Sequence, residues 1–420
     1  MANPTTYSGV WWIPDGSRRF NGDKHTGTLT YCGDDKSTLV VIHEPSGGTI
    51  FRAYETYDVI LGQDAGGNIF TLFGATLTHR LGDFSKAEFV IRFILVGKHV
   101  HSMEEPVFDT CHIRFPFLNH WALENRITEG ASHNQTNISL DLGYHPPFLS
   151  MDVEDGVRLM LNSLLQDNRT RYSFTANQET YLTIETTNKA SINQYLRNIS
   201  EFSQFLSIAL FAEQHPSEVV FSIKGERINY PLLFNKEKST EPWVLSLIKF
   251  DELKERVPDM YAHWHANYER VYPITHYLIR ATANNSAFDI PDFVSIAQAL
   301  DGYFKRFVNK KDRKDNKKYQ DGIEKLLDAF KDVEVIKKIN LDTNVLTQTR
   351  NKYVHFIPDE DENVANAVDD AGEMYWLMQK CIVLLTCCIL DLLGLTTEEI
   401  NLCCNSSPIN QIVISIPDWM

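Results

Sequence analysis

The chain has 420 residues, of which 43% are hydrophobic and 23% charged, as in an ordinary soluble globular protein of two or three domains. Its formal net charge of −15 excludes a general nucleic-acid coat, because affinity for phosphate backbones comes from Lys and Arg. A local basic patch is still compatible with RNA binding. Seven cysteines, an odd number, predict reduced thiols in a cytoplasmic protein, and no secretory signal is expected at the N-terminus.

The N-terminal part of the chain, to about residue 185, is rich in runs of β-branched and aromatic residues bounded by Gly, Asp and Asn. Many short strands at this spacing predict a sandwich or barrel-like domain. A helix is expected over 191–211. The predicted strands are 28–32, 38–44, 49–62, 68–77, 87–97, 180–186, 216–223 and 226–234, with a turn at 63–68.

The pattern changes to a helical period from about residue 240. Over 246–282, Pro258 and Pro273 are expected to break or kink the helix. Amphipathic segments follow at 291–307 and 323–339. We therefore expect an α+β protein, with a β-rich domain over 1–240 and an all-helical bundle over 241–420.

The longest predicted helix is 363–395, with Gly394 as its cap. Its apolar stretch approaches the length of a membrane span, but Gln379, Lys380 and Asp391 interrupt it, so a buried helix is expected. Apolar residues occupy nearly all of its faces, and such a helix needs cover on every side. This pattern predicts a homodimer or a higher even oligomer through the bundle.

The stretch LTQTRNKYVHF (346–356) places Arg350, Asn351 and His355 within six residues, just before the long apolar helix. Arg provides a fixed charge and a planar fork for phosphate oxygens, and His can transfer protons near neutral pH. The chain holds several other Arg–His pairs at similar spacing, but only this one has four intervening residues and Asn after Arg. The pattern therefore favours a phosphate-cleaving site here over an ordinary polar surface.

A geometric difficulty accompanies this pair. Five residues along an ideal helix rotate by about 140°, so Arg350 and His355 do not stack on one face. Either the helix ends near Val354, as Pro358 favours, or the two side chains complete a site with a second copy of the chain.

A basic run at 303–319 is a concentrated positive island in this acidic chain, with a tyrosine at each end. It is either a surface that contacts RNA or a solvated connection between helices. Its basic residues are Lys305, Arg306, Lys310, Lys311, Arg313, Lys314, Lys317 and Lys318.

Two histidine pairs, His99 with His101 and His263 with His265, invite a metal interpretation. No Cys or carboxylate at a standard spacing completes either set, so structural or surface histidines are expected and no metal or cofactor is predicted. The sequence contains no phosphate-binding loop, nucleophile elbow or zinc-protease motif.

The motif RNKYVH (350–355) resembles the R-N-x-x-x-H form of the arginine–histidine motif of HEPN domains, small helical bundles found in many prokaryotic RNases. IAQALDGYFKRF and LLTCCILDLLGL resemble the early and closing helices of that bundle. YSGVWWIPDG and YDVILGQDAGGNIFTLFGATL are similar to the N-terminal domain of the ApeA-like anti-phage HEPN nucleases. Asp301 departs from the family pattern, which often has Glu at this position.

This resemblance implies a metal-independent endoribonuclease that acts in abortive infection, with tRNA anticodon loops as the expected substrate. Arg350 and His355 carry over as the catalytic pair and Asn351 as its polar support. Residues 241–420 would be the HEPN ribonuclease domain, and residues 1–240 a sensor for a phage-derived trigger. HEPN domains usually dimerise so that two motifs meet, and no membrane partner is implied.

Two alternatives remain open at this point. One is a non-catalytic HEPN module that binds nucleotide or protein, in which Arg350 only pairs with a phosphate. The other is a β-domain binding protein, for example for carbohydrate, in which the bundle serves dimerisation. Activity with purified RNA distinguishes the first alternative from the ribonuclease.

Overall fold

The protein is represented by a computed structural model, and its contacts divide the chain into two compact units. The first unit comprises 1–119, 123–200 and 215–238, and the second comprises 120–122, 201–214 and 239–420. The predicted boundary between 240 and 241 stays a prediction. The structure describes residues 4–14, 23–42, 56–81, 86–124, 127–132, 135–140, 145–154, 156–169, 174–283, 288–308, 319–405 and 407–417.

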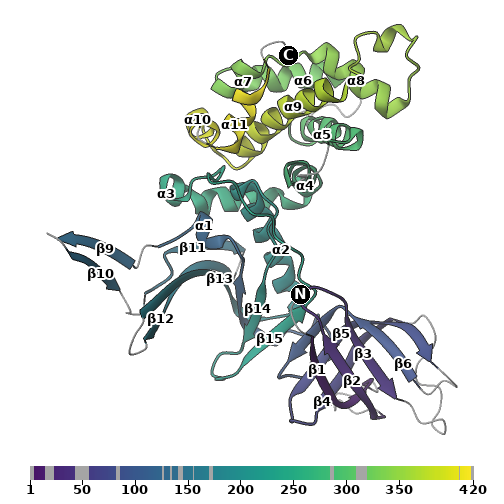
Figure 1. The fold of residues 1–420 in the computed structure, drawn as a ribbon, viewed down its shortest axis with the longest axis vertical. Coiled ribbons are helices and arrows are strands. Elements are labelled where there is room, and N and C mark those ends of the chain that lie inside the picture. The colour runs from purple at the N-terminus through teal and green to yellow at the C-terminus, as the bar shows by residue number, and fades with distance from the viewer. Residues whose placement is uncertain are drawn as a thin grey trace. The chain divides into compact units, whose positions relative to one another are not determined.

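Six strands near the N-terminus form a closed antiparallel barrel (Figure 1). Around the barrel the order is β5-β4-β1-β2-β3-β6, and β6 pairs again with β5 to close it. Closure removes free edges from the sheet. The strands are β1 (Thr5–Trp12), β2 (His25–Tyr31), β3 (Ser37–Ile42), β4 (Thr56–Asp64), β5 (Ile69–Leu81) and β6 (Lys86–Ile91).

The barrel interior is filled by inward-facing apolar side chains, among them Trp11, Phe70 and Phe89. Gly62 allows this packing, because a Cβ on it would lie 2.1 Å from the Trp11 ring. The predicted turn at 63–68 is confirmed, with the Asp64 carboxylate accepting a 2.8 Å hydrogen bond from the Asn68 N–H. The first unit is therefore β-rich and barrel-containing, as the sequence predicts.

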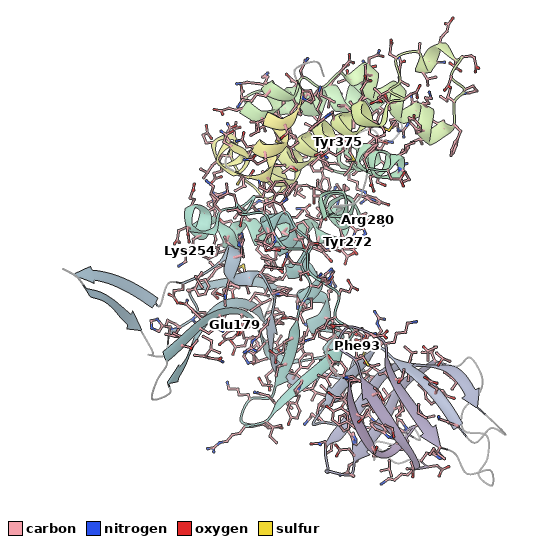
Figure 2. The ribbon with its side chains drawn as sticks, in the orientation of Figure 1. Phe93, Glu179, Lys254, Tyr272, Arg280 and Tyr375 are labelled. Carbon is pink, nitrogen blue, oxygen red and sulfur yellow. The ribbon has the colours of Figure 1, made fainter. Side chains whose placement is uncertain are left out.

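The sheet continues from β5 through β7 into an open array of further strands, where Figure 2 labels Phe93 on β7 and Glu179 on β13. The predicted strand at 87–97 is two strands, since β6 pairs within the barrel and β7 pairs with β5 and β15. The order is β7 (Phe93–Val96), β15 (Asn229–Phe234), β14 (Glu218–Ser222), β8 (Phe108–Arg114), β13 (Phe174–Ala190), β12 (Val157–Arg169) and β11 (Leu149–Glu154), with a separate hairpin of β9 (Ile127–Ser132) and β10 (Gln135–Leu140).

Two helices interrupt the strands, α1 (Leu118–Trp121) and α2 (Ile192–Leu210), the second close to its predicted range. From residue 250 onward the described chain is helical. Its elements are α3 (Phe250–Leu253), η1 (Lys254–Arg256), α4 (Val257–Ala283), α5 (Ile290–Tyr303), the π-helical η2 (Phe304–Val308), α6 (Tyr319–Ala329), α7 (Glu334–Ile339), α8 (Thr343–His355), η3 (Glu362–Val364), α9 (Ala371–Leu392), α10 (Thr397–Asn405) and α11 (Pro408–Ser415).

The expected break is confirmed next to Pro258, since α3 and η1 precede α4, which begins at Val257. At Pro273 the expected break is wrong, because α4 continues through it. Pro258 lies in the first turn, where the missing N–H is harmless. Pro273 lies inside the helix, but Val271, Ile274 and Leu278 around it are fully buried. Their packing outweighs the cost of one proline, about 3 kcal/mol. Another correction is that 323–339 forms two helices, α6 and α7.

Helix α9 is the core helix of the second unit, although α4 exceeds it in length. By length and composition α9 is also long and apolar enough to cross a membrane, but 78% of its most apolar stretch is buried inside the protein, as expected of a core helix. Helices α4, α5, α7, α10 and α11 pack around it. Other helices of the same chain cover α9, so its apolar surface does not support the oligomer that was predicted from it.

Candidate active site

Helix α8, which carries the predicted motif, has defined ends. The Asp342 carboxylate caps its N-terminus by accepting hydrogen bonds from the N–H groups of Asn344 (2.9 Å) and Val345 (3.0 Å). At the other end Phe356 adopts a left-handed φ of 52°, and its N–H donates to the Lys352 carbonyl. The helix therefore ends at His355, which agrees with the first of the two alternatives drawn from the sequence.

The three predicted site residues lie together within one chain. Arg350 Nη1 donates to Asn351 Oδ1 at 2.9 Å and lies 3.3 Å from His355 Nε2. A guanidinium only donates hydrogen bonds, so Nε2 accepts this one, which requires a neutral imidazole with its proton on Nδ1. The long arginine side chain thus reaches around the helix end, and contact between the two residues requires no second copy.

Tyr319, at the start of α6, holds the guanidinium from one side. The Arg350 guanidinium carbon lies 5.2 Å from the centre of the Tyr319 ring, within the range of a cation–π contact. The Tyr319 hydroxyl donates to the Ala297 carbonyl of α5 at 3.2 Å. Burial raises the pKa of Tyr319 well above its ordinary 10.0, so this hydroxyl stays protonated at neutral pH.

Arg350 is only partly satisfied by these contacts. Its Nε is buried and has no hydrogen-bond partner among the described residues, whereas Nη1 faces the exposed His355. Tyr319 is a site residue that the motif 350–355 does not indicate. Its only sequence signal is its position at the end of the basic run.

Lys352 of α8 forms ion pairs with the segment that follows this helix. Its ammonium group forms ion pairs with Asp359 and Asp369, and the Tyr353 hydroxyl donates to Asp369 at 3.1 Å. The hydrogen bond from Lys352 lowers the pKa of Asp369, and the two carboxylates raise the pKa of Lys352. These contacts hold the acidic connection to α9 beside the site, which the sequence analysis also missed.

The structure describes two of the eight predicted RNA-binding residues, and both have protein contacts. The Lys305 ammonium pairs with Asp301 at 2.7 Å, and Arg306 donates to the Arg270 carbonyl at 2.5 Å. Both side chains are exposed and lie in η2, directly after α5. The other six, Lys310, Lys311, Arg313, Lys314, Lys317 and Lys318, lie outside the described residues.

The histidines considered for metal binding have protein partners instead. His99 Nε2 lies 3.1 Å from the Gly62 carbonyl, and His263 Nδ1 lies 2.9 Å from the Asp259 carbonyl. His265 Nδ1 lies 2.7 Å from the buried Glu201 carboxylate. Within the described ranges no three His, Cys, Asp or Glu side chains form a group that could hold a metal ion.

Two family models match the chain and together span most of it. Residues 6–264 match ApeA N-terminal domain 1, and residues 294–399 match Apea-like HEPN. The chain belongs to the ApeA-like HEPN family. No curated protein and no solved structure matches it.

In this ApeA-like HEPN chain, the second match contains the complete Arg350, Asn351 and His355 group together with Tyr319. HEPN domains are typically RNases, so membership supports a nuclease role at the level of the family. The barrel and the open sheet fall within the first match. Both resemblances noted in the sequence are therefore confirmed.

Proposed function

We propose that this chain is a metal-independent endoribonuclease of anti-phage defence and that Arg350 and His355 are its catalytic residues. The observation that carries the proposal is the 3.3 Å contact between Arg350 Nη1 and His355 Nε2, with Asn351 on the same guanidinium nitrogen. A fixed positive charge beside a neutral imidazole is what RNA cleavage by the 2′-OH requires.

The chemistry follows from this arrangement. When RNA binds, a phosphate oxygen replaces His355 as the acceptor for Arg350 Nη1, which frees the lone pair of His355 Nε2. Nε2 then takes the proton of the ribose 2′-OH while that oxygen forms a bond to phosphorus. The bond from phosphorus to the 5′ oxygen breaks, and this oxygen takes up a proton from solvent. Arg350 stabilises the charge that develops on the phosphate oxygens, and the Tyr319 ring keeps its guanidinium in position. The products are a 2′,3′-cyclic phosphate and a 5′-OH.

The basic run supports RNA as the substrate. Lys317 and Lys318, at the end of this run, directly precede Tyr319 in the sequence, and the Tyr319 ring contacts Arg350. The run is therefore connected by the chain to the candidate site. We propose that its lysines and arginines bind the RNA backbone, and that tRNA anticodon loops are the target.

The remaining parts of the proposal rest on family membership. The β-rich N-terminal part is proposed to sense a phage-derived trigger, and the protein is proposed to act in the cytoplasm as a homodimer or higher even oligomer. Cleavage of host RNA after triggering would then cause abortive infection.

The test is cleavage of purified tRNA by the full chain in excess EDTA, with sequencing and end analysis of the fragments. We expect cleavage to persist, fragments to carry 2′,3′-cyclic phosphate and 5′-OH ends, and DNA to remain intact. A single 2′-deoxy substitution at the cleaved nucleotide should block the reaction, because only RNA provides the nucleophile.

The control is His355→Ala, purified and assayed in parallel. Three results would each contradict the proposal. The first is cleavage by this variant at the wild-type rate. The others are loss of wild-type cleavage in EDTA with its recovery on adding magnesium, and fragments that carry 5′-phosphates. RNA binding without any cleavage would instead indicate a non-catalytic HEPN module.

A further inference from the structure

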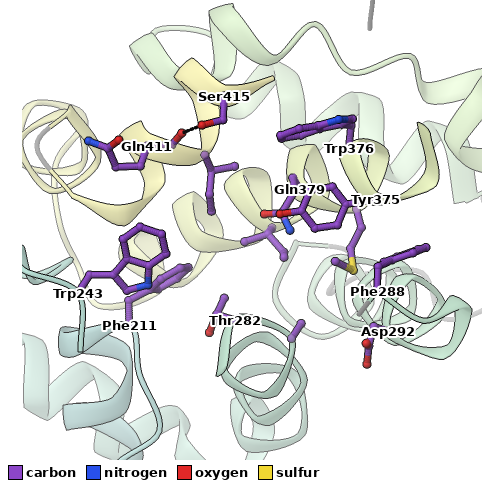
Figure 3. A pocket seen from close by; sticks show the side chains of 14 residues that line it. Phe211, Trp243, Thr282, Phe288, Asp292, Tyr375, Trp376, Gln379, Gln411 and Ser415 are labelled. Carbon is purple, nitrogen blue, oxygen red and sulfur yellow. Dashed lines mark hydrogen bonds between the residues drawn. The ribbon is translucent and has the colours of Figure 1, made fainter. Parts of the chain in front are cut away.

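The second unit contains a pocket that the proposed cleavage chemistry does not use. Its volume is about 310 Å³, at the lower end of the range of about 300–1,000 Å³ for small-molecule sites. Figure 3 shows Phe211 and Trp243 grouped at one end, with Phe288 and Tyr375 at the other. The walls come from the end of α4, the start of α5, the N-terminal half of α9 and α11.

Aromatic rings dominate the lining. Tyr375 lies edge-on to both Trp376 and Phe288, with ring centres 4.9 and 6.0 Å apart. Trp243 is 51% exposed and Tyr375 36% exposed, so two large rings that bound the pocket are also open to solvent. Exposed rings on opposite sides of a small pocket provide faces on which a flat, unsaturated ligand can stack.

A buried amide provides the polar contact. The Gln379 side chain is only 8% exposed, lines the pocket, and has no hydrogen-bond partner among the residues that the structure describes. Figure 3 shows it beside the Tyr375 ring. Among the other polar lining residues, the Thr282 hydroxyl donates to the Ile279 carbonyl and the Ser415 hydroxyl to the Gln411 carbonyl. Gln411 lines the pocket as well, but it is exposed, whereas Gln379 is buried.

Because the Gln379 amide lines the pocket and bonds to no other described residue, it is free to bond to a ligand there. An amide offers donors and an acceptor side by side, which matches a ligand edge with an adjacent acceptor and donor. Adenine has such an edge, and Gln is one of the side chains that contact it with two hydrogen bonds.

Charge narrows the class of ligand further. Asp292 is the single charged residue among the lining residues, all of which the structure describes. A carboxylate disfavours phosphates and other anions, so the part of the ligand that enters the pocket is not an anion. The aromatic faces, the free amide and the volume together favour a purine base over a sugar or an anion.

We propose that this pocket binds an adenine base, stacked on its aromatic rings and held by the Gln379 amide. The base is supplied either by a free nucleoside or by an unstacked nucleotide of an RNA. Only the second source depends on the proposed ribonuclease function.

The experiment is titration calorimetry of the full chain with adenosine and, in parallel, with uridine. We expect saturable binding of adenosine that is at least tenfold tighter than that of uridine. Gln379→Leu, which keeps the side-chain volume, should weaken adenosine binding at least tenfold, because two hydrogen bonds are lost. Tyr375→Ala should weaken it as well, whereas Tyr375→Phe keeps the ring and should retain it.

Thermal unfolding of each variant separates loss of the site from loss of the fold. Gln379→Leu is expected to unfold close to the wild-type temperature, because it keeps the side-chain volume and removes no hydrogen bond between described residues. Absence of saturable nucleoside binding to the wild type would overturn the proposal, and so would unchanged adenosine affinity in Gln379→Leu.

Competition then identifies the source of the base. An adenine-containing RNA oligonucleotide is added to the His355→Ala protein saturated with adenosine, so that cleavage does not interfere. Displacement of adenosine indicates that the pocket takes a base of the RNA. Adenosine that stays bound while the RNA binds indicates a free nucleoside as the ligand. Because no cleavage is measured, this test is independent of whether the chain is a ribonuclease.

Discussion

The guanidinium of Arg350 is held between two partners, with the Tyr319 ring 5.2 Å from its carbon and His355 Nε2 3.3 Å from its Nη1. The contact with Tyr319 is structural, whereas the contact with His355 belongs to the proposed chemistry. This division distinguishes the expected effects of replacing the two residues.

Replacing His355 by Ala should abolish RNA cleavage, a loss of about 10²-fold or more, because a proton-transfer group is removed. Its side chain is exposed, so the free energy of unfolding should change by less than about 0.5 kcal/mol. Arg350→Ala should also abolish cleavage, but it removes a half-buried cation–π contact and should cost about 1 kcal/mol. Cleavage assays and thermal unfolding on the same samples check both. Equal stability losses in the two variants would contradict this assignment.

Mixing the two inactive variants tests whether the catalytic pair is formed within one chain. Arg350 and His355 already touch in the monomer, so a dimer of Arg350→Ala with His355→Ala contains no intact pair on either chain. We expect co-refolded mixtures to stay inactive. Recovery of about a quarter or more of wild-type activity would show that Arg350 of one chain works with His355 of another.

Phe356 should be replaceable by Gly with a gain in stability. Its φ of 52° is left-handed, which costs a residue with a Cβ about 1 kcal/mol relative to Gly. Its ring is 88% exposed, so little packing is lost with it. We expect Phe356→Gly to raise the free energy of unfolding by up to about 1 kcal/mol in a denaturant titration. Phe356→Ala, which keeps a Cβ, is the matched control and should give no such gain.

The connection between α8 and α9 should loosen in acid. The folded pKa of Asp369 lies below its ordinary 3.8, so the contribution of its pair with Lys352 is complete above pH 3.8 and is lost as the pH falls through the folded value. Asp369→Asn should therefore be less stable than the wild type near neutral pH, with the difference vanishing in acid. Thermal unfolding from pH 7 to 3 checks this.

Glu360→Gln provides the control for this pH dependence. Glu360 is exposed in the same connection and no ion pair is found for it in the described part of the chain. Its replacement should leave the unfolding temperature unchanged over the same range. A difference between Asp369→Asn and wild type that does not shrink as the pH falls below 3.8 would show that the ion pair is not its cause.

The sequence predicted those features that depend on local pattern. Alternation identified most strands and the helical period identified the bundle, while Arg350, Asn351 and His355 are neighbours in one motif. The sequence did not predict the closure of the barrel, because alternation shows which face of a strand is buried but not that β6 pairs with β5. Tyr319 was missed as a site residue for the same reason, since its contact with Arg350 joins two separate helices. At Pro273, tertiary packing overrode a local rule.

The six strands of the barrel are consecutive in the chain and end at Ile91, whereas the open sheet needs β14 and β15, which end at Phe234. Chains are synthesised from the N-terminus and their domains fold as they emerge. The barrel has all its strands as soon as the first quarter of the chain has left the ribosome. β7 and β8 must wait for partners that are made more than 100 residues later. During that interval β7 lacks β15, and β8 lacks first β13 and then β14, so the open sheet is completed only long after the barrel, although still before Arg350 and His355 are translated.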